Sequence, residues 1–82
     1  MSFLATDKFT ESAKASSVRF TKYKLVVILF DGREISVPLE YFPRLRDASS
    51  KERENWRLIG GGIGIHWEDL DEDISVEGLL RG

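Results

Sequence analysis

The stretch GGGIGIHWEDLDEDISVEGLL, residues 60–80, decides the predicted fold of this chain. It joins a glycine turn, an alternating strand, a run of carboxylates and an apolar end. The glycines at 60–62 indicate a tight turn, because glycine adopts positive φ without steric cost. After them, Ile63, Ile65 and Trp67 alternate with small or polar residues. This alternation predicts a strand with its apolar side chains on one face.

Upstream, the pattern predicts two strands joined by a tight turn. Residues 18–30 are typical of one long strand, whose second part is apolar on both faces and should be covered on both sides. Asp31 and Gly32 are typical of a two-residue hairpin turn, so residues 33–37 should return antiparallel. Pro38 has no N–H to donate and is expected to end the pairing.

Two short helices are predicted in the middle of the chain. Pro43 suits the first turn of a helix over residues 44–48, because its missing N–H would be unpaired there in any case. Ser49 and Glu52 match a capping box, which predicts a second helix over residues 50–55.

With a third strand at residues 56–59, the order is strand, strand, helix, strand, strand, short terminal helix. This order predicts an α+β fold: a small antiparallel sheet of about four strands, a short helical segment between strands 2 and 3, and a short C-terminal helix. Residues 1–15 show no sustained period and are expected to be a flexible N-terminal tail. Residues 16–82 are then a single α+β domain.

Size and composition lower the expectation of an enzyme or a membrane protein. A chain of 82 residues buries only about 60 to 65% of its unfolded surface, which leaves little room for a deep cleft. There is no cysteine, and therefore neither a disulfide framework nor a thiolate metal site. No segment reaches the roughly 18 apolar residues of a membrane span, and the start lacks a secretory signal pattern. We expect a cytoplasmic, non-enzymatic protein.

The charges are divided unevenly along the chain. The net charge is −2, yet residues 1–57 hold 11 Lys and Arg against 8 Asp and Glu, whereas residues 58–82 hold one Arg against 6 acids. Such asymmetry is typical of a surface for a charged partner. It also fits two halves that pair with each other inside one fold.

The acidic run begins like a calcium loop but does not complete one. Asp69, Asp71 and Asp73 would take positions one, three and five of an EF-hand. Position six then falls on Ile74 instead of glycine, and position twelve on Leu80 instead of glutamate. A standard EF-hand is excluded, and an irregular weak divalent site on these carboxylates is left open. The glycines also miss the spacing of nucleotide-binding loops, so no metal or other cofactor is predicted.

The main interpretation of the acidic run is structural. Asp73 or Ser75 would accept hydrogen bonds from the first turn of the terminal helix. The apolar residues around the run would fasten the end of the chain to the sheet. Arg53 and Arg57 are expected close to Asp71 or Asp73, where they would offset the repulsion between carboxylates.

His66 is the only histidine, so one chain cannot complete a zinc site of imidazoles or thiolates. Strand alternation places it on the face opposite Ile65 and Trp67, half exposed and hydrogen-bonded near the acidic turn. A catalytic histidine would need an orienting carboxylate and a pocket. No catalytic residue is predicted, and a small enzyme around His66 and the acids is kept as an alternative.

Several motifs together resemble a known family. They are GIHWEDLDEDISVEGLL at residues 64–80, FDGR at 30–33, VPL at 37–39 and YFPRL at 41–45. They look like the small bacterial family catalogued as domain of unknown function 2442, and the likeness begins around Ala15. The resemblance implies an antitoxin-like or regulatory partner of another small protein. Some longer members carry a helix-turn-helix domain; this sequence ends after the motif, so we expect partner binding instead of direct transcriptional regulation.

The predicted function is therefore that of a protein-interaction module. A basic partner would be steered by Glu68, Asp71, Glu72 and Asp73 and anchored by Trp67. Self-association through an open sheet edge is a further expectation.

The alternative partner is nucleic acid, bound through a basic stretch between the predicted second and third strands. The five cations of this stretch are Arg44, Arg46, Lys51, Arg53 and Arg57. Clustered cations bind phosphate backbones by releasing counterions. Interleaved acids are more typical of a solvated helical face, so this alternative ranks second.

Overall fold

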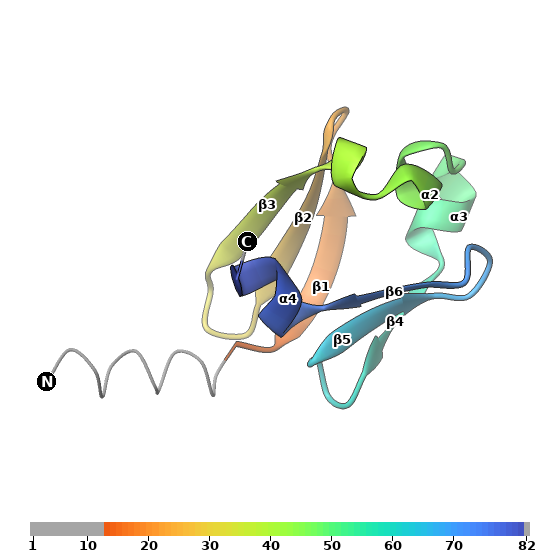
Figure 1. Ribbon diagram of the computed structural model, residues 1–82. Helices are drawn as coiled ribbons and strands as arrows, with labels where there is room; N and C mark the ends of the chain where they lie inside the picture. The colour runs from red at the N-terminus through yellow and green to blue at the C-terminus, as the bar shows by residue number, and fades with distance from the viewer. Residues whose placement is uncertain (1–12, 82) are drawn as a thin grey trace, which may run out of the picture.

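The computed structural model describes residues 13–81, which form an α+β fold with two antiparallel three-stranded sheets. The first sheet has the order β1 (Ala15–Phe20), β2 (Lys24–Leu29) and β3 (Glu34–Pro38). The second has the order β4 (Trp56–Ile59), β5 (Gly64–Trp67) and β6 (Glu72–Ser75). The helices are η1 (Leu39–Tyr41), α2 (Pro43–Arg46), α3 (Ser50–Glu54) and α4 (Val76–Arg81). Figure 1 shows the two sheets side by side, with η1, α2 and α3 along one end and α4 between β3 and β6. The α+β class is confirmed.

The prediction of one long strand over residues 18–30 is wrong, because the chain turns back at residues 21–23. Thr21 N–H donates to Lys24 O at 2.9 Å, and Lys24 N–H donates to Thr21 Oγ1 at 3.0 Å. The threonine hydroxyl takes the place of a backbone acceptor and closes a hairpin between β1 and β2. Tyr23 O in the turn also accepts Leu39 N–H at 2.9 Å.

The prediction of a single sheet of about four strands is also wrong, because part of the acidic run is itself a strand. Residues 72–75 form β6, which pairs antiparallel with β5. Ile65 lies opposite Ile74, and both side chains are buried. The apolar gain on this face outweighs the low strand propensity of Asp and Glu. The short terminal helix is present as α4 and begins one residue after the strand ends.

The helical segment between the second and third predicted strands is present. Ser49 Oγ accepts Glu52 N–H at 3.1 Å, and Glu52 Oε1 accepts Ser49 N–H at 2.9 Å, so the capping box is confirmed. Pro43 is the first residue of α2, as expected. The helix ends at Arg46, two residues earlier than predicted, and η1 precedes it without a sequence signal.

The core lies between the two sheets and contains Trp67. This side chain is fully buried, and its indole N–H donates to Arg53 O at 2.9 Å. The Phe20 ring meets it edge to face, with 6.3 Å between the centroids. Ile65 is also fully buried, but Ile63, predicted on the same face, is 55% exposed. Ile63 belongs to the glycine turn, where strand alternation does not apply.

The glycine turn of the second sheet is hydrogen-bonded to β1 and to α4, the first and last elements of the described chain. Gly60, Gly61 and Gly62 have φ of 58°, 71° and 113°, which confirms the predicted turn. Gly62 O accepts Ala15 N–H at 2.7 Å, and Ile63 O accepts Val76 N–H at 3.0 Å. The turn therefore holds the beginning of β1 and the beginning of α4 together.

The predicted tail falls mostly on residues 1–12, which lie outside the described residues. Ala15, the last residue assigned to that tail, is fully buried and begins β1.

Gly62 should tolerate a side chain less well than Gly61. A Cβ at Gly62 would overlap the backbone O of Ala15, whereas a Cβ at Gly61 meets nothing within 4 Å. Both positions have positive φ, so each alanine variant should lose about 1 kcal/mol of unfolding free energy. Gly62→Ala should lose roughly 1 to 3 kcal/mol more, because the two backbones must separate. Urea unfolding measures both variants, and equal losses would contradict this close approach.

Candidate functional site

The carboxylates of the acidic run gather at the turn between β5 and β6. Residues 68–71 form this turn, and Asp71 N–H donates to Glu68 O at 3.4 Å. Asp71 has φ of 49°, the one positive value at a non-glycine residue among residues 13–81. Aspartate tolerates this conformation because its short polar side chain bonds locally. The turn thus exposes acidic side chains beyond the end of the second sheet.

The two faces of this hairpin differ in chemistry. The inner face buries Ile65, Trp67 and Ile74 in the core. The outer face carries His66 opposite Asp73, as the register of β5 and β6 requires. This confirms that His66 lies on the face opposite Ile65 and Trp67.

His66 lies between two carboxylates. Its Nδ1 is 2.6 Å from Asp73 Oδ1, and its Nε2 is 3.5 Å from Glu68 Oε2. The imidazole is only 12% exposed, whereas the Asp73 and Glu68 side chains are 70% and 64% exposed. The hydrogen bond with Asp73 raises the pKa of His66, desolvation opposes it, and Glu68 adds a smaller increase. The two carboxylates therefore favour the protonated form of the imidazole.

The sequence prediction missed Asp73 as the partner of His66. The carboxylates weighed for His66 were Glu68 and Asp69, which are close to it in sequence, whereas Asp73 was proposed, with Ser75, as a cap of the terminal helix. Of these two, Ser75 is the cap: its Oγ accepts Gly78 N–H at 2.9 Å. Only the register of β5 and β6 brings position 73 opposite position 66.

Catalysis and metal binding at His66 stay predictions. His66 does not line any of the cavities of 390, 340 and 220 Å³ found in the described part of the chain. Within residues 13–81, no three His, Cys, Asp or Glu side chains gather as a metal site would require. Asp69 instead accepts a hydrogen bond from Asn55 Nδ2 at 3.0 Å.

The expected contact of Arg53 with Asp71 or Asp73 is wrong. Arg53 turns the other way and donates to the carbonyls of Leu45 and Arg46, both at 2.8 Å. These carbonyls belong to the last two residues of α2 and attract the guanidinium, because carbonyls at the end of a helix lack helical partners.

Two other arginines reach the turn between β5 and β6. Arg57 pairs with Glu68 at 3.3 Å. Arg44 donates to the backbone carbonyl of Asp71 at 2.9 Å and to that of Leu70 at 3.3 Å. The cations of the middle segment therefore do hold the acidic turn in place. One of them is Arg44, which the sequence did not suggest as a partner of the turn. The other is Arg57, which pairs with Glu68 instead of the expected Asp71 or Asp73.

The predicted nucleic-acid surface does not form a continuous set of unpaired cations. Arg44 and Arg53 donate to backbone carbonyls, and Arg57 pairs with Glu68. Arg46 pairs with Asp47 at 2.9 Å. The remaining cation of the predicted set is Lys51, which is exposed on α3. Nucleic-acid binding through this face stays a prediction, and the internal use of these arginines disfavours it.

Trp67 cannot be the exposed anchor that the sequence suggested. It is fully buried, and its indole N–H is bonded to Arg53 O. The four carboxylates belong to one hairpin: Glu68 and Asp71 lie in its turn, and Asp73 is on its outer face opposite His66. Glu72 is the first residue of β6, lies opposite Trp67 on the same face as that residue, and is half-buried. A partner would therefore meet the carboxylates without the indole.

Comparison with known proteins gives a family and a fold, but no activity. The family described as "Protein of unknown function (DUF2442)" matches residues 15–82. A crystal structure of a protein of unknown function from Rhodospirillum rubrum is similar with a TM-score of 0.71 and 31% identity, covering 84% of this chain and 86% of that one. An uncharacterised protein from Chromobacterium violaceum, solved by NMR, has a TM-score of 0.74 and 24% identity, covering 98% and 75%. No curated protein matches.

Within residues 13–81, no helix has the length and apolar character needed to cross a membrane.

The pKa of His66 should lie above its ordinary value of about 6.5. The folded state then binds the proton more tightly than the unfolded state does. The resulting stability is complete below the unfolded pKa and is lost as pH rises through the folded pKa. NMR titration of the single histidine should show the raised pKa, and Asp73→Asn should lower it. As pH rises from below the ordinary histidine pKa to above the raised pKa of the folded state, the wild type should lose more unfolding free energy than Asp73→Asn. An identical histidine pKa in both proteins would exclude the contact.

Proposed function

The chain belongs to the family of proteins of unknown function DUF2442, and from the geometry of its hairpin we propose that it is a non-enzymatic protein-interaction module. We define the acidic hairpin surface as Glu68, Asp71, Glu72 and Asp73. In this proposal, the surface binds a basic segment of another protein.

The observation that carries the proposal is the excess of exposed negative charge at the turn. Residues 68–73 contain five carboxylates, and the neighbouring basic groups are Arg44, Arg57 and His66. Close carboxylates repel each other, which costs folding free energy. The core does not need them, because the inner face of the hairpin is already filled by apolar side chains. A negative surface of this kind steers a basic partner and raises its association rate.

The position of this surface also favours protein over nucleic acid. Arg44 and Arg57, two cations of the alternative face, lie against the acidic turn. The carboxylates around them would repel a phosphate backbone. The family resemblance supports the finer proposal of an antitoxin-like or regulatory role toward another small protein in the cytoplasm.

The proposal predicts that removing charge from the acidic hairpin surface slows binding. Asp71→Asn with Glu72→Gln removes two charges and keeps side-chain shape, and asparagine also tolerates positive φ at position 71. Affinity capture from a lysate of the source organism, read by mass spectrometry, identifies partners held by the wild type. Their association rate with the double variant should fall roughly threefold at low salt, and the difference should shrink as salt is added.

A matched control removes two exposed carboxylates elsewhere, at Glu40 in η1 and Glu77 in α4. Glu40→Gln with Glu77→Gln changes net charge by the same amount. It should leave the association rate close to that of the wild type. Equal association rates for the wild type and both double variants would reject the acidic hairpin surface as the binding site.

A further inference from the structure

One edge of β1 has backbone groups without a strand partner in the described part of the chain. β1 is at the end of the first sheet, paired with β2 on one side only. Thr21 N–H donates toward β2, and Leu29 N–H of β2 donates to Arg33 O on the opposite side. Antiparallel alternation therefore directs the N–H and C=O groups of Val18 and Phe20 to the outer edge of β1.

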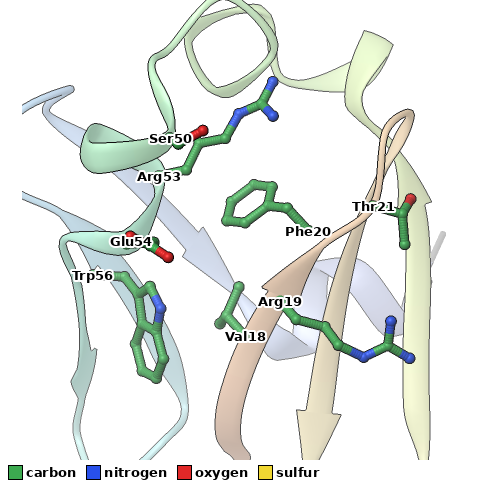
Figure 2. A pocket seen from close by; sticks show the side chains of 8 residues that line it. All are labelled: Val18, Arg19, Phe20, Thr21, Ser50, Arg53, Glu54 and Trp56. Atoms are coloured by element: carbon green, nitrogen blue, oxygen red, sulfur yellow. The ribbon is translucent and has the colours of Figure 1, made fainter.

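This outer edge is closed at one end and open at the other. At its beginning, Ala15 N–H donates to Gly62 O of the second sheet at 2.7 Å. Further along, the edge borders a cavity of 390 Å³ whose opposite wall is α3 and the beginning of β4. Figure 2 shows the side chains of Val18 and Phe20 directed from β1 toward Trp56 and α3. The two sheets thus diverge and leave a walled groove beside unpaired backbone groups.

The groove has a mixed lining, in which three apolar side chains lie beside polar and charged ones. Val18, Phe20 and Trp56 are apolar lining residues. Arg53 is held by carbonyls and lies over the Phe20 ring at 5.3 Å. Arg19 pairs with Glu34 at 3.0 Å and points away from the groove (Figure 2). Glu54 is exposed and has no ion pair among the described residues, so its carboxylate is available to a cation of a ligand, next to the carbonyl-bonded guanidinium of Arg53.

We propose that this groove binds an extended, basic segment of the partner protein, which adds to β1 as a further strand. Its backbone would pair with Val18 and Phe20, its inward side chains would be apolar, and a cation would face Glu54. The inference rests on the proposed function, since the groove adjoins the acidic turn. Asn55, next to Glu54, donates to Asp69 Oδ2 at 3.0 Å.

The walls of the groove favour a single strand over a second copy of this chain. A copy pairing through its own β1 would bring its α3 and β4 with it, because both flank that edge. A lone extended segment needs only the space between β1 and α3. Main-chain hydrogen bonds would supply affinity, and the alternate side chains would supply specificity.

Amide NMR of the full chain tests the groove with a defined probe. The probe is a blocked seven-residue peptide that alternates valine and lysine. A matched peptide carries N-methyl groups at the positions that would pair with β1 and therefore cannot donate hydrogen bonds there. The first peptide should shift the Val18 and Phe20 amide signals saturably with a Kd below about 1 mM. The N-methylated peptide should not, and Glu54→Gln should raise Kd about threefold while Glu40→Gln leaves it unchanged.

The outcomes separate the groove from the proposed function. Shifts confined to residues 68–73 would reject the groove and leave the acidic hairpin surface in place. Shifts at Val18 and Phe20 that persist with unchanged Kd in Asp71→Asn with Glu72→Gln would support the groove and count against steering by the hairpin. Equal binding of the N-methylated peptide would reject strand pairing. Shifts at Val18 and Phe20 that depend on protein concentration without peptide would assign the edge to a second copy and overturn the proposal.

Discussion

The buried indole of Trp67 is the contact on which the rest of the structure depends. It lies in the core shared by both sheets, its N–H donates to Arg53 O, and Phe20 packs against it edge to face. Trp67 belongs to β5, and its side chain contacts two elements from earlier parts of the chain, helix α3 and strand β1. A small domain has little apolar area to bury, so a fully buried aromatic ring contributes a large share of its stability. The same contact sets the position of α3 and therefore one wall of the groove beside β1.

In the hairpin of β5 and β6, the residues that pack in the core differ from those that carry charge. The inner face supplies packing, whereas the outer face and the turn carry charge. His66 and the arginines reduce the repulsion among the carboxylates. The concentration of carboxylates at this turn is the feature on which the proposed interaction with a basic partner rests. The acidic hairpin surface and the groove adjoin one another, so one basic partner segment could contact both.

Local signals predicted local structure, and long-range pairing produced the differences. The capping box at Ser49, the glycine turn and the strand ending at Trp67 each depend on a few adjacent residues, and the sequence predicted them. The break after Thr21 has no glycine, proline or asparagine signal and depends on a hydroxyl that replaces a backbone acceptor. Strand β6 forms because β5 is there to pair with it, and only that register brings Asp73 to His66. The alternation of residues 63–67 correctly predicted that Trp67 and Ile65 share a face. That this face is buried in the core depends on the packing of the two sheets, which the sequence pattern does not show.

Hydrogen exchange of the two indole N–H groups tests this account most directly. The chain has two tryptophans: Trp67 is fully buried, and Trp56 is half-buried beside the groove. The account predicts that the Trp67 indole exchanges only through global unfolding, with a protection free energy equal to that of unfolding, while the Trp56 indole exchanges faster. Fast exchange of both indoles in a folded protein would contradict the central place of Trp67.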